Sequence, residues 1–198
     1  DEETGMTGAF GLKPGLLQGD ILLNLDSEDE GELYVGCAGG TNANATFTYK
    51  EEPVTQGVAS FKLAITGLKG GHSGLEIILQ RGNSNKLMNR FLQHAVVEHG
   101  LRLASIEGGS LRNAIPRESF ALVTVPPSKA DDLIKCVADY EKMYRSELSA
   151  TEPDLKFTIS ATSTPNSVID AASLDKVMKA INACPNGAMR MSDDMKGL

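Results

Sequence analysis

A histidine enclosed by glycines is the residue best suited to chemistry in this sequence. The segment Gly-Gly-His-Ser-Gly at residues 70–74 contains His72 and follows a run in which apolar and polar residues alternate. Histidine is easily poised near neutral pH as a proton donor or acceptor. Flanking glycines let the backbone approach a ligand closely and leave the imidazole uncovered. The segment predicts a functional histidine, although an ordinary glycine loop with an incidental histidine explains these residues equally well.

Carboxylates at two other places could hold a cation or move a proton. Asp1, Glu2 and Glu3 are adjacent, and Asp26 ends the apolar run at residues 20–26. Adjacent carboxylates repel one another, so a site that keeps them together usually supplies a cation or shifts a pKa. A carboxylate at a strand end can also be a hard ligand for a metal. The alternatives are a solvated acidic turn at the first three residues and a strand-end or helix-capping role for Asp26.

A polar connection between two predicted strands, residues 108–116, contains Arg112 and Asn113. A guanidinium can bind a carboxylate through two hydrogen bonds, and a side-chain amide can donate to a carbonyl oxygen. These two residues are therefore candidates for substrate binding. A polar hairpin without a ligand is the simpler interpretation of the same residues.

The remaining histidines and the cysteines are not expected to do chemistry. His94 and His99 lie on or just beyond the polar face of a predicted helix, so we expect both to be solvated. The cysteines are odd in number, widely spaced and without a Cys-x-x-Cys pair, which indicates free thiols in a reducing compartment. We interpret them as small, buried apolar side chains. They are Cys37, Cys136 and Cys184.

Composition argues against two classes of partner. The 198-residue chain carries a net charge of −7, and no basic patch stands out that could neutralise phosphates. No apolar run approaches the roughly 20 residues that span a bilayer. We therefore expect a soluble protein with no nucleic-acid and no membrane partner. The chain lacks an initiator methionine, a signal segment and a helix stop at its last residues, so we expect both ends to be cut from a longer protein.

Hydrophobic periodicity predicts the elements that position these residues. Apolar runs at 20–26 and 33–37 are typical of buried strands, and open α/β sheets bind ligands at the carboxyl ends of such strands. From residue 57 onward the pattern predicts the order β-α-β-β-α-β, which matches the ferredoxin-like split unit of an α+β fold. The strands are expected at 60–66, 101–106, 120–125 and 155–159, with one helix starting at Asn83 or Ser84 and another after residues 126–128. A further helix over 174–181 stops at 184–187, and another strand could begin at Ala188.

Several segments together resemble one family, the bacterial aminoacyl-histidine dipeptidases (Xaa-His dipeptidase, peptidase D) of the aminoacylase and carboxypeptidase superfamily of di-zinc peptidases. The segments are residues 1–12, 22–40, 67–92, 108–118 and 185–198. The resemblance covers nearly the whole chain in the right order. It implies that residues 1–50 are part of an α/β catalytic domain. Residues 51–198 are then a ferredoxin-like lid of the dimerisation type, truncated at its C-terminus.

The resemblance also implies a role for each candidate carboxylate. Glu2 matches the general base, Glu3 matches a ligand of one zinc ion, and Asp26 matches a ligand of the other. Two zinc ions in the intact protein, with cobalt or manganese as alternative metals, would share a water, lower its pKa and polarise the peptide carbonyl. Glu2 would take the proton of that water and pass it to the leaving amine.

For the lid, the resemblance implies that His72 stabilises the oxyanion of the tetrahedral intermediate. Asn113 matches a lid group that meets substrate, and Arg112 beside it is a second candidate for substrate binding. The implied partners are a short peptide substrate and a second copy of the chain, which would form a homodimer through the lid. The implied location is the cytoplasm.

Some of the family's metal ligands have no counterpart in this sequence. The family's His-x-Asp motif, bridging aspartate and late histidine are missing, which leaves one ligand per metal where a catalytic zinc expects about three. We therefore expect the chain to be inactive alone and its parent to be a zinc-dependent dipeptidase. The alternatives are a tripeptidase or an N-acyl amino acid deacylase of the same superfamily, and a non-catalytic dimerisation module.

Overall fold

A computed structural model describes residues 5–23, 25, 30–34, 36 and 39–194 of the chain. The chain divides into two compact units, residues 1–46 and residues 47–198. Three of the predicted site residues, Glu2, Glu3 and Asp26, lie outside the described residues. Within the described ranges, none of the helices is both long and apolar enough to cross a membrane.

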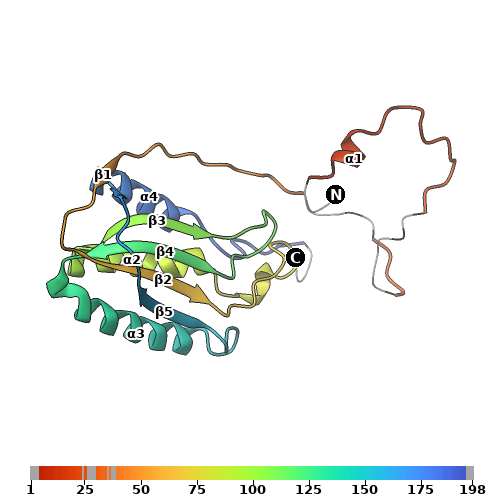
Figure 1. The fold of residues 1–198 in the computed structure, drawn as a ribbon. Coiled ribbons are helices and arrows are strands. Elements are labelled where there is room, and N and C mark those ends of the chain that lie inside the picture. The colour runs from red at the N-terminus through yellow and green to blue at the C-terminus, as the bar shows by residue number, and fades with distance from the viewer. Residues whose placement is uncertain (1–4, 24, 26–29, 35, 37–38, 195–198) are drawn as a thin grey trace. The chain divides into compact units, whose positions relative to one another are not determined.

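The second unit is built on a four-stranded antiparallel sheet with the strand order β3-β4-β2-β5 (Figure 1). Its strands are β2 (Ala59–Thr66), β3 (Arg102–Gly108), β4 (Ser119–Val125) and β5 (Lys156–Ala161). Helix α2 (Ser84–His99) joins β2 to β3, and helix α3 (Ala130–Glu147) joins β4 to β5. This order of elements confirms the predicted ferredoxin-like split unit.

Local signals explain where the two helices begin and end. Asn83 caps α2, because its side-chain oxygen accepts hydrogen bonds from the backbone N–H groups of Asn85 and Lys86. Gly100 ends α2 in the left-handed conformation at φ 62°, which glycine adopts without a steric penalty. A short 3₁₀ turn, η3 (Pro127–Lys129), leads into α3. Acidic residues in the first turn of α3 stabilise the helix, because their negative charge interacts favourably with the positive end of the helix dipole.

The core lies between the sheet and the helices. Phe91 of α2 packs edge-on against Phe157 of β5, with ring centroids 4.8 Å apart. Tyr144 of α3 is fully buried and donates a hydrogen bond of 2.8 Å from its hydroxyl to the backbone oxygen of Leu87. The apolar spacing of α3 predicts Leu133, Ile134, Val137 and Tyr144 on one face of the helix, but Ile134 is 42% exposed. The other three side chains are buried as predicted.

A small second sheet and a third helix complete this unit. Strand β1 (Glu51–Pro53) pairs antiparallel with β6 (Ser167–Ile169). Helix α4 (Ala171–Ala183) follows β6, starts at the cap residue Asp170 and packs against α2. The helix predicted over residues 174–181 is confirmed, and it buries Leu174 and Met178. The strand considered at Ala188 does not form within the described residues, which end at residue 194.

The first unit differs from its predicted structure. Among its described residues there is one short helix, α1 (Thr7–Phe10). The described residues of the two predicted strands, 20–26 and 33–37, form no strand. Leu22 and Leu25 are 85% and 90% exposed. A strand satisfies its backbone N–H and C=O groups only by pairing with a neighbouring strand. The described residues of this unit provide no such neighbour, so the apolar runs remain uncovered.

Candidate functional site

The two polar segments singled out in the lid meet in space. The His72 segment connects β2 to α2, and the segment containing Arg112 and Asn113 connects β3 to β4. The backbone N–H of Ser73 donates to the backbone oxygen of Asn113 over 2.8 Å. His72 itself forms an isolated antiparallel bridge with Ala114. Residues about 40 positions apart in the chain therefore form one surface, because the strands that carry them are in the same sheet.

The imidazole of His72 is exposed, and its orientation is set by its own loop. Nδ1 accepts hydrogen bonds from the backbone N–H groups of Gly74 at 3.1 Å and Leu75 at 3.2 Å. A neutral imidazole whose Nδ1 accepts must carry its proton on Nε2. The loop therefore presents Nε2–H as a hydrogen-bond donor, and it occupies the other nitrogen that could have bound a metal.

An ion pair behind the loop supports the backbone of His72. Glu76 accepts a hydrogen bond of 2.7 Å from the backbone N–H of His72 and forms an ion pair of 2.7 Å with Arg81. Arg81 also donates to the backbone oxygen of Gly70 over 2.6 Å. The hydrogen bond from His72, and then the charge of Arg81, lower the pKa of the Glu76 carboxyl. Gly71 has φ +138°, a backbone conformation that L side chains rarely adopt, so this position favours glycine.

A buried carboxylate holds both ends of the same loop. Glu152 is 0% exposed and accepts hydrogen bonds of 2.8 Å from the backbone N–H groups of Lys69 and Gly82. Buried charges are stable only when hydrogen bonds replace their lost hydration. Sequence reasoning missed Glu76, Arg81 and Glu152, although Glu76 is only four residues beyond His72 in the sequence.

The cysteine and histidine predictions hold only in part. His94 is exposed as expected, but His99 is half-buried. Cys136 is half-buried, Cys184 is exposed rather than buried, and both are free thiols. Cys37 lies outside the described residues. Burial and the nearby charges of His94 and Lys129 lower the pKa of His99, because both disfavour the imidazolium.

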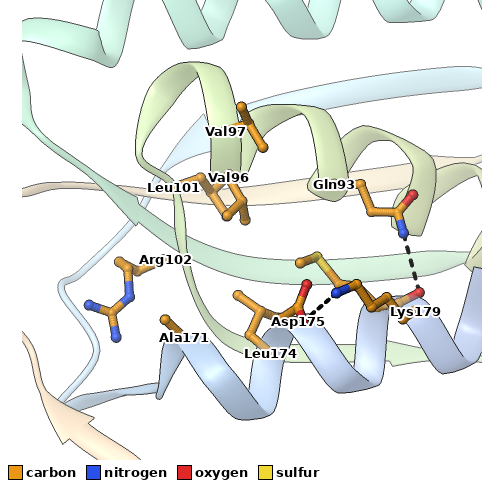
Figure 2. A pocket seen from close by; sticks show the side chains of 10 residues that line it. Gln93, Val96, Val97, Leu101, Arg102, Ala171, Leu174, Asp175 and Lys179 are labelled. Atoms are coloured by element: carbon orange, nitrogen blue, oxygen red, sulfur yellow. Dashed lines mark hydrogen bonds and ion pairs between the residues drawn. The ribbon is translucent and has the colours of Figure 1, made fainter.

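An apolar hollow between α2 and α4 has fewer groups suited to chemistry. Figure 2 shows that Asp175 and Lys179 on α4 point toward one another, and they form an ion pair of 2.7 Å. Arg102 is paired with Glu52 over 2.6 Å. The cavity has a volume of about 280 Å³ and otherwise presents mainly aliphatic side chains. These are Val96, Val97, Leu101, Leu174 and Met178. Because its charged groups already form ion pairs with one another or with Glu52, the hollow is a poor candidate for a catalytic site.

Comparison with known proteins identifies the central part of the chain. Residues 55–152, which run from just before β2 to just after α3, match the family model of the peptidase dimerisation domain of M20 type. Residues 55–152 are an M20 peptidase dimerisation domain. The dimerisation domain contains the His72 loop, the Asn113 connection and Glu152, so all three lie in the matched part of the chain.

Two relatives match the whole chain, including the residues outside the dimerisation domain. The cytosol non-specific dipeptidase of Escherichia coli (strain K12) is 46% identical over 197 residues, which is 100% of this chain and 41% of the relative. The crystal structure of aminoacylhistidine dipeptidase from Vibrio alginolyticus matches with a TM-score of 0.82 and 43% identity. That match covers 100% of this chain and 40% of the other. The chain thus spans about two fifths of the length of these relatives.

Proposed function

We propose that this chain is part of a zinc-dependent dipeptidase that hydrolyses Xaa-His and other short dipeptides. In this proposal residues 51–198 are the lid and residues 1–50 contribute to the catalytic domain. Support comes from the two relatives, whose names describe dipeptidases, and from the dimerisation domain at residues 55–152. The cytosolic relative and the free thiols support a cytoplasmic location. The dimerisation domain supports a homodimer.

The observation that carries the proposal is the orientation of His72. Two backbone donors hold its Nδ1, so the exposed ring offers Nε2–H to a ligand. In peptide hydrolysis, negative charge develops on the carbonyl oxygen only as the water attacks. A donor fixed before the reaction stabilises that charge without reorganisation. Arg112 and Asn113 lie in the adjoining connection and bind the carboxylate and carbonyl groups of the dipeptide in this proposal.

The carboxylates of the first unit complete the proposed chemistry. Glu3 and Asp26 would each hold one zinc ion, because carboxylate oxygen is a normal zinc ligand. The metal, when bound, supplies an acidified water and polarises the substrate carbonyl. Glu2 stays off the metal, accepts the water proton and returns it to the leaving amine. Two carboxylates fall short of the roughly three protein ligands of each catalytic zinc, so the 198-residue chain alone should be inactive.

The decisive experiment replaces His72 by alanine in the longer protein that carries these residues. We expect turnover of a dipeptide such as Ala-His to fall by about 10²–10³-fold, with a much smaller change in KM. Zinc content and Tm should stay unchanged. Lost zinc would indicate a ligand, and a lower Tm with near-normal turnover would indicate a structural residue. Either result would exclude the oxyanion role.

A second pair of variants separates the two adjacent glutamates. Glu3→Ala should lower zinc content, whereas Glu2→Gln should keep the metal and lose about 10²–10⁴-fold in turnover. The reverse pattern in elemental analysis would exchange their roles. Profiling the same protein with tripeptides and N-acyl amino acids tests the substrate class, because preferred cleavage of either would replace the dipeptidase assignment.

Mixing variants tests whether the homodimer shares the site. If His72 acts on the partner's zinc site, hybrids of His72→Ala and Glu2→Gln subunits should regain activity, because each hybrid holds one complete site. Demonstrated hybrids without activity would place His72 in the site of its own subunit.

A further inference from the structure

Two histidines of α2 and a cysteine of α3 converge on the helical layer, away from the His72 loop. The ligand atoms of His94, His99 and Cys136 all lie within 4.8 Å of one another. The His72 loop adjoins the first residue of α2, and the ten residues from Ser84 to His94 span about 15 Å of helix. The three residues therefore form a cluster separate from the proposed catalytic site.

The geometry of the cluster is close to that of a zinc site. Zinc bonds of about 2.0–2.1 Å to nitrogen and 2.3 Å to sulfur place tetrahedral ligand atoms roughly 3.3–3.6 Å apart. The observed spread exceeds this by about 1 Å, which modest rotations of three side chains can remove. None of the three is locked in the core, because His94 is exposed and the other two are half-buried. The His94 ring also lies against Tyr140, with ring centroids 5.4 Å apart and the ring planes tilted by 42°.

One atom of the cluster lacks a partner that a metal would supply. Nδ1 of His99 is buried and has no hydrogen bond. A buried polar atom without a partner costs about 1–3 kcal/mol, so native proteins rarely leave one. Burial also lowers the pKa of His99, which favours the neutral ring that binds metals. Coordination through Nδ1 would satisfy this nitrogen.

The charges around the cluster favour a cation. The hollow that contains it has a volume of about 400 Å³ and is lined by three carboxylates against one lysine, and Lys129 adds a second positive charge near His99. The carboxylates belong to Glu98 on α2 and to Asp132 and Asp139 on α3. The negative charge of Asp132 also acts on the His99 imidazole and opposes the lowering of its pKa. Burial and Asp139 raise the pKa of the Cys136 thiol, so a bound cation must displace the thiol proton.

We propose that His94, His99 and Cys136 bind one zinc ion, with a water as the fourth ligand. Imidazole and thiolate suit a borderline-soft cation, which zinc is, better than the hard cations magnesium and calcium. Binding forms one zinc–sulfur and two zinc–nitrogen bonds and releases the thiol proton to solvent. The ion would link α2 to α3 across the helical layer. The proposal does not depend on the dipeptidase function, because none of these residues takes part in it.

The test titrates the 198-residue chain with Co²⁺, a spectroscopic substitute for zinc, under reducing conditions. We expect one thiolate-to-cobalt charge-transfer band that saturates at one ion per chain and disappears when Zn²⁺ is added. Cys136→Ser should abolish the band, whereas Cys184→Ser, the matched control, should keep it. Glu3→Ala should also keep it, which separates this site from the proposed catalytic metals. No band, or a band that survives Cys136→Ser, would overturn the proposal.

A second measurement covers the case in which Cys136→Ser fails to fold. His94→Gln and His99→Gln should each weaken Zn²⁺ binding in calorimetry by at least about tenfold, with circular dichroism unchanged. Asp132→Asn should weaken it more than Asp131→Asn, since both acids lie in the first turn of α3 and only Asp132 lines the hollow. Equal zinc affinity for wild type and both histidine variants would reject the site.

Discussion

The two compact units of this chain contain similar apolar runs, but these runs form paired strands in only one of the two units. In residues 47–198 the alternating segments become paired strands, and every residue of the core cluster comes from this unit. In residues 1–46 the leucines at 22 and 25 remain exposed. An apolar pattern therefore specifies a strand only where the chain also supplies its pairing partner. The contrast has a functional side, since the proposed carboxylate ligands and base fall in the first unit and the proposed oxyanion donor in the second.

The largest loss of stability is expected from a substitution in the packed core. Phe91→Ala removes a fully buried ring that contacts both Phe157 and Tyr140, so it should lower the free energy of unfolding by about 3–5 kcal/mol. Phe10→Ala is the matched control, because Phe10 is 80% exposed and should change stability by less than about 0.5 kcal/mol. Urea unfolding measures both. Similar losses for the two variants would mean that the first unit is packed more tightly than described.

The next effect concerns the carboxylate that holds the His72 loop. Glu152→Ala leaves two backbone N–H groups without an acceptor and should destabilise the protein by about 2–4 kcal/mol. Glu147→Ala provides the contrast, since its ion pair with Arg90 is partly exposed and contributes at most about 1 kcal/mol. If the Glu152 variant were as stable as the Glu147 variant, the loop would not depend on its buried anchor.

A smaller effect is expected at the start of α2. Asn83→Ala removes the cap oxygen and should cost about 1 kcal/mol in urea unfolding. Asn83→Ser should restore most of this stability, because serine caps helices nearly as well. Failure of serine to rescue would assign the effect to the 2.7 Å hydrogen bond between the side chains of Asn83 and Asn186.

The smallest change in stability is expected when the whole first unit is removed. Removing residues 1–46 should change the unfolding free energy of the remaining unit by less than about 0.5 kcal/mol, since no core residue is lost. Its urea midpoint and its slope should both match those of the full chain. A clear drop in stability would show that the first unit contributes packing to the second.

Much of the second unit could be predicted because its signals are local. The period-two run containing Phe61 and Leu63 and the cap at Asn83 or Ser84 defined β2 and the start of α2 correctly. The order of elements then determined the strand order, since few topologies accommodate it. Periodicity was less reliable at Ile134, where adjacent apolar residues on α3 compete for one inward position.

The supporting residues of the site could not be predicted, because they depend on contacts between distant segments. In the sequence, Glu152 looks like an ordinary surface acid. Only the fold brings the backbone N–H groups of Lys69, after β2, and Gly82, before α2, within hydrogen-bond distance of its carboxylate. His94 and Cys136 are more than 40 residues apart and meet only when α2 and α3 lie side by side. His72 is a candidate because of its flanking glycines, and its role stays a prediction. The nitrogen that it presents depends on the fold of its loop and could not be predicted.

The central position of β2 has a consequence for how the protein folds. Phe61 of β2 faces Val123 of β4 on one side and Ala161 of β5 on the other. Strand β2 therefore pairs with segments that lie roughly 60 and 100 residues further along the chain. Closing such long loops slows folding. During synthesis at about 5–20 residues per second, β2 stays unpaired for several seconds. Its apolar side chains are a natural target for chaperones in that interval, even though the finished sheet buries them at its centre.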